Sequence, residues 1–257
     1  MRFVLVHGGL HGAWCWERVI PELRALGHQA IAIDLPGHAT RAEEEVTLAT
    51  RRQALVEVIE PGDVLVGHSA GGYDITLAAD AVPERIGHLV YLAGLPPVEG
   101  KSLIEAGRDS PVFETDESGG TQMAADDSGT ESAIAINAQG AMECVDFAKT
   151  WAMFYHDCDE DSARWAFERL TPMPIGFLQE IVNLPRFWRT DPPRSYVHCL
   201  QDRVARPRQR EYMAHRLGVE PLVIDASHSP FLSRPRETAE CLVRAAATRP
   251  VGPLLPR

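Results

Sequence analysis

The chain has 257 residues, enough for one sizeable domain with a small insertion, and its 45% hydrophobic and 24% charged residues are ordinary for a globular protein. A formal net charge of −11 argues against a polyanion such as nucleic acid as partner. No apolar stretch approaches the length of a membrane span, so we expect no membrane association either.

Short apolar, β-branched runs recur along the chain with helical patterns between them. They predict strands at Phe3–His7, Ala30–Asp34, Val64–His68, His88–Ala93, Ser195–Leu200 and Pro221–Asp225. Helical spacing is found at Trp16–Leu26, Leu48–Ile59, Ala70–Ala81, Arg208–Leu217 and Arg236–Ala247. This alternation predicts an α/β fold with a mostly parallel six-stranded sheet flanked by helices.

The alternation stops between residues 95 and 193, which we interpret as an inserted cap on a core formed by 1–94 and 194–257. An acidic stretch at 114–132 has the composition of a solvated loop. Helical patterns follow at Ala138–Phe154 and Asp159–Leu170. Most aromatic residues of the insertion should pack it onto the core, and a few should line a pocket.

The five cysteines are odd in number and show no C-x-x-C spacing. This argues against a disulfide scaffold or a zinc site and fits a reducing compartment. The first strand begins at once, which leaves no room for a signal peptide. We therefore expect a cytoplasmic protein, and we expect no metal and no other cofactor.

The stretch "VLVGHSAGG" places Ser69 at a corner between a predicted strand and a predicted helix. The G-x-S-x-G pattern in that context is typical of a nucleophile elbow, which presents a serine hydroxyl at the end of a sheet. The flanking glycines suit so tight a turn because they have no Cβ. Ser69 is therefore the candidate nucleophile.

A serine nucleophile needs a base within hydrogen-bond reach and an acid that orients the base. Asp202 follows the strand that ends at Leu200, and His228 follows the strand that ends at Asp225. Parallel strands deliver such residues to one edge of the sheet, so we predict a Ser69–His228–Asp202 triad.

Two other carboxylates compete for the role of acid. Asp225 ends the same strand that delivers His228, which suits a structural role better. Asp34 precedes the serine in the chain and would violate the order serine, acid, histidine. His68, beside the nucleophile, should point away from the substrate.

The oxyanion hole requires two backbone N–H groups near the developing negative charge. The amide of Ala70 follows from the elbow itself. The second amide should come from "HGGLHGAW" after the first strand, where Gly9 is the candidate donor. A phosphate-binding loop is disfavoured, because the segment matches neither G-x-G-x-x-G nor G-x-x-x-x-G-K-[ST].

With these residues identified, the chain resembles the α/β-hydrolase superfamily along nearly its whole length. The motifs are "FVLVHGGLHGAWCWERV", "DLPGHA", "GHSAGG", "QDRVARPRQREYMA" and "ASHSPFLSRPRE". They resemble most the branch that contains plant methylesterases, small bacterial esterases and α-hydroxynitrile lyases. The resemblance implies the same triad, the same oxyanion amides and a cap between the sixth and seventh strands of the superfamily fold.

Three positions depart from the lyases of that branch, which carry a threonine, a glutamate and a lysine there. This chain has Gly8, His68 and Ser229 instead. Without a cation beside the leaving group, cyanide would have no charge partner. The departures favour the esterase.

The leading hypothesis is a serine carboxylic ester hydrolase that acts on small to medium esters through an acyl-enzyme. Amide, carbamate or lactone hydrolysis is the nearest alternative, followed by carbon–carbon hydrolysis, the lyase reaction and a non-catalytic ligand receptor. The expected partner is a small-molecule ester, and a homodimer stays open. The candidate pocket residues are Gly8, Leu10, Trp151 and Phe154.

Overall fold

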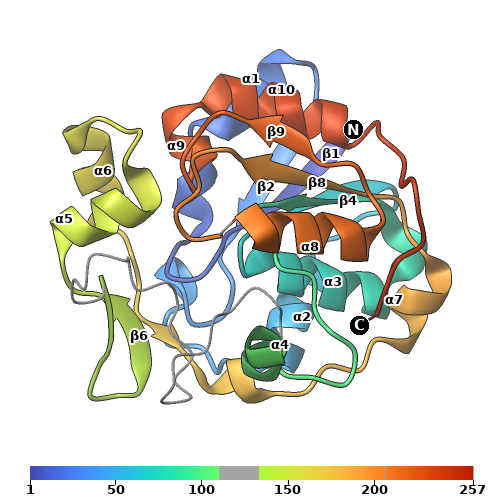
Figure 1. Ribbon diagram of the computed structural model, residues 1–257, viewed down its shortest axis with the longest axis horizontal. Coiled ribbons are helices and arrows are strands. Elements are labelled where there is room, and N and C mark those ends of the chain that lie inside the picture. Colours follow the sequence, from blue (N-terminus) through green and yellow to red (C-terminus); the bar gives the residue numbers. More distant parts are fainter. Residues whose placement is uncertain (110–132, 206, 257) are drawn as a thin grey trace.

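A computed structural model describes residues 1–109, 133–205 and 207–256 of the chain (Figure 1). The acidic stretch 114–132, for which the sequence predicts a solvated loop, lies outside the described residues.

The centre of the molecule is a sheet of six strands in the order β2-β1-β3-β4-β8-β9. All neighbouring strands in it run parallel. The strands are β1 (Arg2–Val6), β2 (Gln29–Ile33), β3 (Asp63–His68), β4 (Ile86–Leu92), β8 (Arg194–Cys199) and β9 (Leu222–Ile224). The predicted parallel six-stranded sheet is thus confirmed, with boundaries shifted by one or two residues.

Helices cover both faces of this sheet (Figure 1). α1 (Val19–Ala25) and α10 (Pro235–Ala245) pack together on one face. α3 (Gly71–Ala81), with α2 (Leu48–Val56) against it, and α8 (Pro207–Leu217) lie on the other. Within the described ranges, no helix combines the length and apolar character needed to cross a bilayer.

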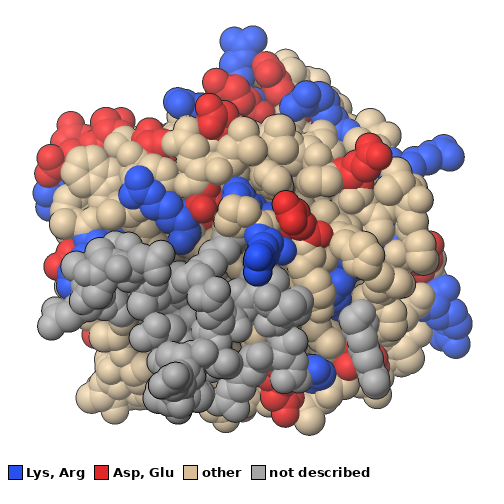
Figure 2. Space-filling view, viewed as in Figure 1, with Lys and Arg blue, Asp and Glu red and all other residues tan. Residues whose placement is uncertain are grey.

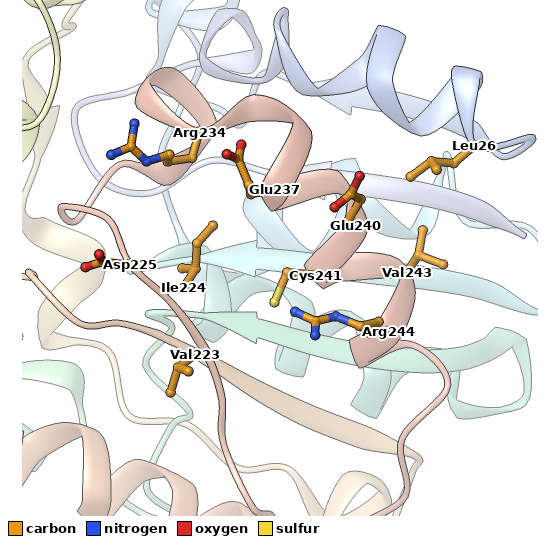
Figure 3. Close-up of a pocket in the computed structure, with 10 residues that line it drawn as sticks. All are labelled: Leu26, Val223, Ile224, Asp225, Arg234, Glu237, Glu240, Cys241, Val243 and Arg244. Carbon is orange, nitrogen blue, oxygen red and sulfur yellow. The ribbon is translucent and has the colours of Figure 1, made fainter.

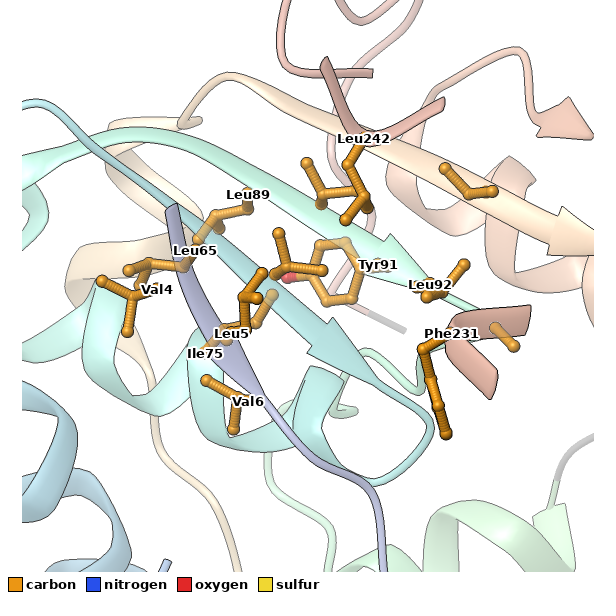
Figure 4. Close-up of a cluster of buried hydrophobic side chains, with 14 of the residues drawn as sticks. Val4, Leu5, Val6, Leu65, Ile75, Leu89, Tyr91, Leu92, Phe231 and Leu242 are labelled. Carbon is orange, nitrogen blue, oxygen red and sulfur yellow. The ribbon is translucent and has the colours of Figure 1, made fainter. Parts of the chain in front are cut away.

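The core lies where the central strands meet these helices (Figure 4). Val4, Leu65 and Leu89 from three neighbouring strands are fully buried, and so is Leu242 of α10. Each such side chain contributes about 1.5–3 kcal/mol by leaving water. Because both faces of β3 are covered, all six of its residues are buried, and the end of this strand is a rigid platform.

The segment between β4 and β8 contains the remaining longer elements. Three short strands form a separate antiparallel sheet, β5-β6-β7. The elements are α4 (Leu103–Asp109), β5 (Ile134–Ile136), β6 (Ala141–Cys144), α5 (Phe147–Thr150), η4 (Trp151–Tyr155), α6 (Glu160–Phe167), β7 (Met173–Pro174), η5 (Gly176–Gln179) and α7 (Pro185–Thr190). Short turns elsewhere are η1 (Ala13–Trp16), η2 (Ala39–Arg41), η3 (Pro83–Arg85) and α9 (Pro230–Ser233).

This insertion has two parts in space. α5, α6 and β6 project to one side of the molecule, whereas α7 packs on α3 of the core (Figure 1). The division into a core of 1–94 and 194–257 and a cap of 95–193 stays a prediction.

The predicted helix Ala138–Phe154 is wrong in its first half, where the chain forms a hairpin. Asn137 Oδ1 accepts the amides of Gln139 and Ala141, each at 3.0 Å, and Gly140 adopts a positive φ of 74°. Asparagine and glycine at these positions favour a tight turn more strongly than the helical spacing favours a helix. By contrast, the helix predicted from Asp159 is confirmed as α6, with Asp159 as its N-cap.

Candidate active site

Ser69 occupies the sharp turn between β3 and α3 with a positive φ of 50°. For a residue with a Cβ this conformation is strained by about 1–3 kcal/mol. The turn is held because the Ser69 amide donates to Leu92 O at 3.1 Å and Ser69 O accepts from the Leu95 amide at 3.0 Å. A Cβ at Gly67 would lie 2.4 Å from Gly71 O, so the pattern requires glycine there. The structure thus has the local geometry that the sequence predicts for an elbow.

His228 and Asp202 lie on the loops that follow β9 and β8 and are joined by a hydrogen bond. Nδ1 of His228 donates to Oδ2 of Asp202 at 2.9 Å, and both side chains are buried. The other oxygen, Oδ1, accepts the amides of Val204 at 2.7 Å and Ala205 at 3.0 Å. Burial raises the pKa of Asp202, but His228 and these amides outweigh it, so the pKa lies below its usual value. Asp202 is therefore ionised, and its Oδ2 accepts a hydrogen bond from the proton that His228 carries on Nδ1.

The elbow and the His228 loop are in direct contact through His68. Its Nε2 donates to the main-chain oxygen of His228 at 2.9 Å, and the two rings are 4.7 Å apart. Burial, followed by the nearby histidines, lowers the pKa of His68 well below 6.5. A neutral His68 that donates from Nε2 has an unprotonated Nδ1, which is buried without a partner in the described part of the chain.

The Ser69 hydroxyl itself has no hydrogen-bond partner among the described residues, and neither has Nε2 of His228. The residue beside Ser69 nevertheless contacts the main chain of His228, so the turn that carries Ser69 and the loop that carries His228 are neighbours. Serine–histidine contacts are often loose without substrate and tighten in the complex.

The glycine-rich loop after β1 lies directly against the elbow. A Cβ at Gly8 would be 2.9 Å from that of Ser69 and 2.8 Å from His68 Nδ1. His7 donates from Nδ1 to Gly8 O at 2.8 Å, which fixes the peptide that carries the Gly9 N–H. In the described residues, neither the Gly9 nor the Ala70 amide donates to another backbone carbonyl.

His11 and Tyr155 support the same loop from the insertion side, a pair that the sequence did not single out. His11 donates from Nδ1 to Gly9 O at 2.9 Å, so its Nε2 accepts the Tyr155 hydroxyl at 2.7 Å. Burial lowers the pKa of His11 to about 4, so the ring is neutral. His11 could have been noticed from its place in "HGGLHG", but no local signal marks Tyr155.

The four predicted pocket residues lie in different surroundings. Gly8 contacts the elbow, and the Phe154 ring is 5.8 Å from His228 and buried. Leu10 is buried with a φ of 68°, and its carbonyl accepts the Thr171 amide at 2.8 Å. Trp151 stacks on Phe147 at 5.7 Å and has its described contacts inside the insertion.

Both rival carboxylates have structural partners of their own. Asp225 is exposed and accepts from Gln201 Nε2 at 2.8 Å. Asp34 accepts the Ala13 amide at 2.6 Å and the Thr40 hydroxyl at 2.5 Å, which ties the loops after β1 and β2 together. Among the acids considered from the sequence, Asp202 is the one that the structure places on His228.

A hollow of about 630 Å³ lies elsewhere, between α10 and the edge strand β9 (Figure 3). Its wall includes Asp225, Glu237, Glu240, Arg234 and Arg244. Neither Ser69 nor His228 lines it.

In the described ranges, no group of three or more His, Cys, Asp or Glu side chains is arranged to hold a metal ion.

Residues 3–241 match the alpha/beta hydrolase family. The chain belongs to that family. Methylesterase 2 of Arabidopsis thaliana is 27% identical to this family member over 259 residues, covering 95% of both chains. The probable esterase PIR7A of Oryza sativa subsp. indica is 42% identical over 109 residues. That match covers 39% of this chain and spans 41% of the rice protein's length.

The same fold is found in solved structures. A pyrethroid hydrolase from Sphingobium faniae JZ-2 superposes with a TM-score of 0.77 at 23% identity, covering 96% of this chain and 98% of the other. This hydrolase-family chain therefore has the same fold as that solved structure over nearly its whole length.

Proposed function

We propose that the protein is a serine carboxylic ester hydrolase in which Ser69 is the nucleophile, His228 the base and Asp202 the acid. The observation that carries this proposal is the bond from His228 Nδ1 to Asp202 Oδ2 at 2.9 Å. It leaves Nε2 of His228 available to take a proton, and a strained serine lies at the end of β3. The esterases and methylesterases among its relatives support the same activity.

The reaction follows from these positions. Ser69 Oγ attacks the ester carbonyl while His228 Nε2 takes the hydroxyl proton. The carbonyl oxygen becomes an oxyanion that accepts hydrogen bonds from the amides of Gly9 and Ala70. The intermediate collapses, the alcohol leaves with the proton from His228, and the acyl group stays on Ser69. Water, deprotonated by His228, then attacks the acyl-enzyme, releases the acid and restores the serine.

The proposed substrates are small to medium esters, methyl esters among them because of the methylesterase relative. Phe154 is the pocket residue best supported by its contacts, since its ring lies near both His228 and His11. Gly8, Leu10 and Trp151 complete the proposed pocket, and the insertion 95–193 acts as its cap.

All five cysteines are free thiols, which supports a reducing compartment such as the cytoplasm.

The test is turnover of p-nitrophenyl butyrate together with intact-mass detection of the acyl group on Ser69. We expect ester cleavage, a butyryl adduct in rapidly quenched samples, and no adduct on Ser69→Ala. Mandelonitrile is the matched probe for lyase activity, since both reactions would need Ser69 and His228. Cyanide release faster than ester cleavage would overturn the proposal in favour of a lyase, and no turnover of any acyl substrate would favour a receptor.

A further inference from the structure

Asp157, which follows η4 in the insertion, is bonded to the loop that carries His228. Its Oδ2 accepts the Ser227 amide at 2.9 Å and the Ser233 hydroxyl at 2.7 Å. These two donors lie before and after His228 in the chain, so one carboxylate oxygen joins the two ends of the loop. Burial raises the pKa of Asp157, but the bonds from the two serines outweigh it and keep the carboxylate ionised. Hydrogen bonds to a charged acceptor are stronger than those between neutral groups.

Two further bonds show that this loop is held from opposite sides. The Ser227 hydroxyl donates to Phe154 O of the insertion at 3.0 Å. From the core, His68 Nε2 donates to His228 O at 2.9 Å. The main chain of His228 is thus fixed between the elbow and the insertion, while Asp202 holds the ring.

We propose that Asp157 is a positioning residue for His228, through which the insertion sets the geometry of the catalytic base. The inference rests on the proposed role of His228 in ester hydrolysis. Asp157 makes no contact with the imidazole, and it acts by fixing the main chain at Ser227 and Ser233. Because Nε2 must lie within hydrogen-bond reach of Ser69, a shift of about 1 Å in this loop can cost about 10²-fold in rate. The insertion therefore helps to position the base of the proposed triad, in addition to its proposed role as a cap.

A purely structural role would be to anchor the insertion on the core, and the chain offers a matched control for that. Asp159, two residues further on, is another carboxylate of the insertion and is the N-cap of α6. It accepts from the Ser162 amide at 2.8 Å and from the Ser162 hydroxyl at 3.0 Å, both within α6. Removing Asp159 disturbs the insertion but leaves the His228 loop bonded.

The experiment compares Asp157→Ala, Asp157→Asn and Asp159→Ala in the full chain. It measures kcat and KM for p-nitrophenyl butyrate, the thermal midpoint, and the downfield proton resonance of the His228 Nδ1–H bonded to Asp202. We expect Asp157→Ala to lower kcat about 10²-fold with little change in KM and to broaden or abolish that resonance. Asp157→Asn should restore most of both, because a single amide oxygen can accept both serine bonds. Asp159→Ala should lower the thermal midpoint and keep kcat within about twofold.

An Asp157→Ala variant with the kcat and resonance of Asp159→Ala would overturn the inference, and Asp157 would then only anchor the insertion. Should Asp157→Ala fail to fold, Ser233→Ala removes one of the two donors and keeps the other. We expect it to lower kcat several-fold, and a wild-type kcat and resonance in that variant would equally refute the role. Failure of the proposed function appears differently, as ester hydrolysis that survives Ser69→Ala while the resonance still responds to Asp157.

Discussion

The core and the insertion each hold one carboxylate through hydrogen bonds. The donors lie close to the carboxylate in the chain in the core, and far from it in the insertion. Asp202, at the end of β8, is fixed by the amides of Val204 and Ala205 in its own loop. Asp157, in the insertion, bonds to Ser227 and Ser233, which are 70 and 76 residues away. The core acid is thus arranged by local turn geometry, and the insertion's acid only by tertiary contact. On the proposed function, the catalytic residues lie on the core, and the insertion fixes the position of one of them.

The strongest test of this division removes the proposed nucleophile from the core. Ser69→Ala should lower ester turnover by up to about 10⁶-fold, because the members of a triad act as a unit. The thermal midpoint should barely change, since the hydroxyl makes no hydrogen bond in the described part of the chain. Steady-state kinetics and thermal unfolding measure both, and a variant that keeps a tenth of its activity would rule out Ser69 as the nucleophile.

Loss of the proposed acid, Asp202 in the loop after β8, should lower turnover about a hundred times less than loss of the proposed nucleophile. Asp202→Asn should keep the fold but lower kcat about 10⁴-fold, because His228 would lose the partner that fixes its tautomer. Asp225→Asn is the matched control, as an exposed carboxylate bonded only to Gln201 among the described residues. An inactive Asp225→Asn beside an active Asp202→Asn would show that the acid is misassigned.

Adding a methyl group at one glycine of the core and at one glycine of the insertion should affect kcat differently, with a smaller effect than the changes above. Gly8→Ala would place a Cβ 2.9 Å from that of Ser69, so the glycine-rich loop after β1 must shift. We expect kcat to fall about 10²-fold, the cost of a displacement near 1 Å. Gly176→Ala in the insertion meets nothing within 4 Å and should leave kcat unchanged. Equal kinetics for the two variants would mean that the loop adapts freely to the added methyl group.

The contact between the core and the insertion at His11 should make the protein less stable as the pH falls. His11 bonds to Tyr155 at this contact, and its folded pKa of about 4 lies below the ordinary 6.5. Between these values the unfolded chain binds more protons, so the stability that His11 contributes is complete above pH 6.5 and is lost as the pH falls towards 4. At pH 5.5 the loss should be about 1 kcal/mol from His11, measurable by urea unfolding at pH 7.5 and 5.5. A free energy of unfolding that rises on acidification would contradict this.

The core and its candidate site could be predicted because their signals are local. Alternating strand and helix patterns give the parallel sheet, and "GHSAGG" gives the elbow, because so tight a turn admits only certain residues. Asp202 and His228 follow from the rule that parallel strands end at one edge. Where turn chemistry and helical spacing disagreed, as at Asn137 and Gly140, the sequence alone gave the wrong element.

Only the tertiary structure could assign Tyr155 to His11 and Asp157 to the His228 loop. These pairs are separated by at least 70 residues, and nothing in the residues near Tyr155 or Asp157 specifies a partner so far along the chain. It also showed that His68 donates to the main-chain oxygen of His228, a bond that the sequence did not predict. Periodicity and turn preferences record which face of an element is buried. Which polar atom lies opposite a buried donor depends on how the insertion packs on the core.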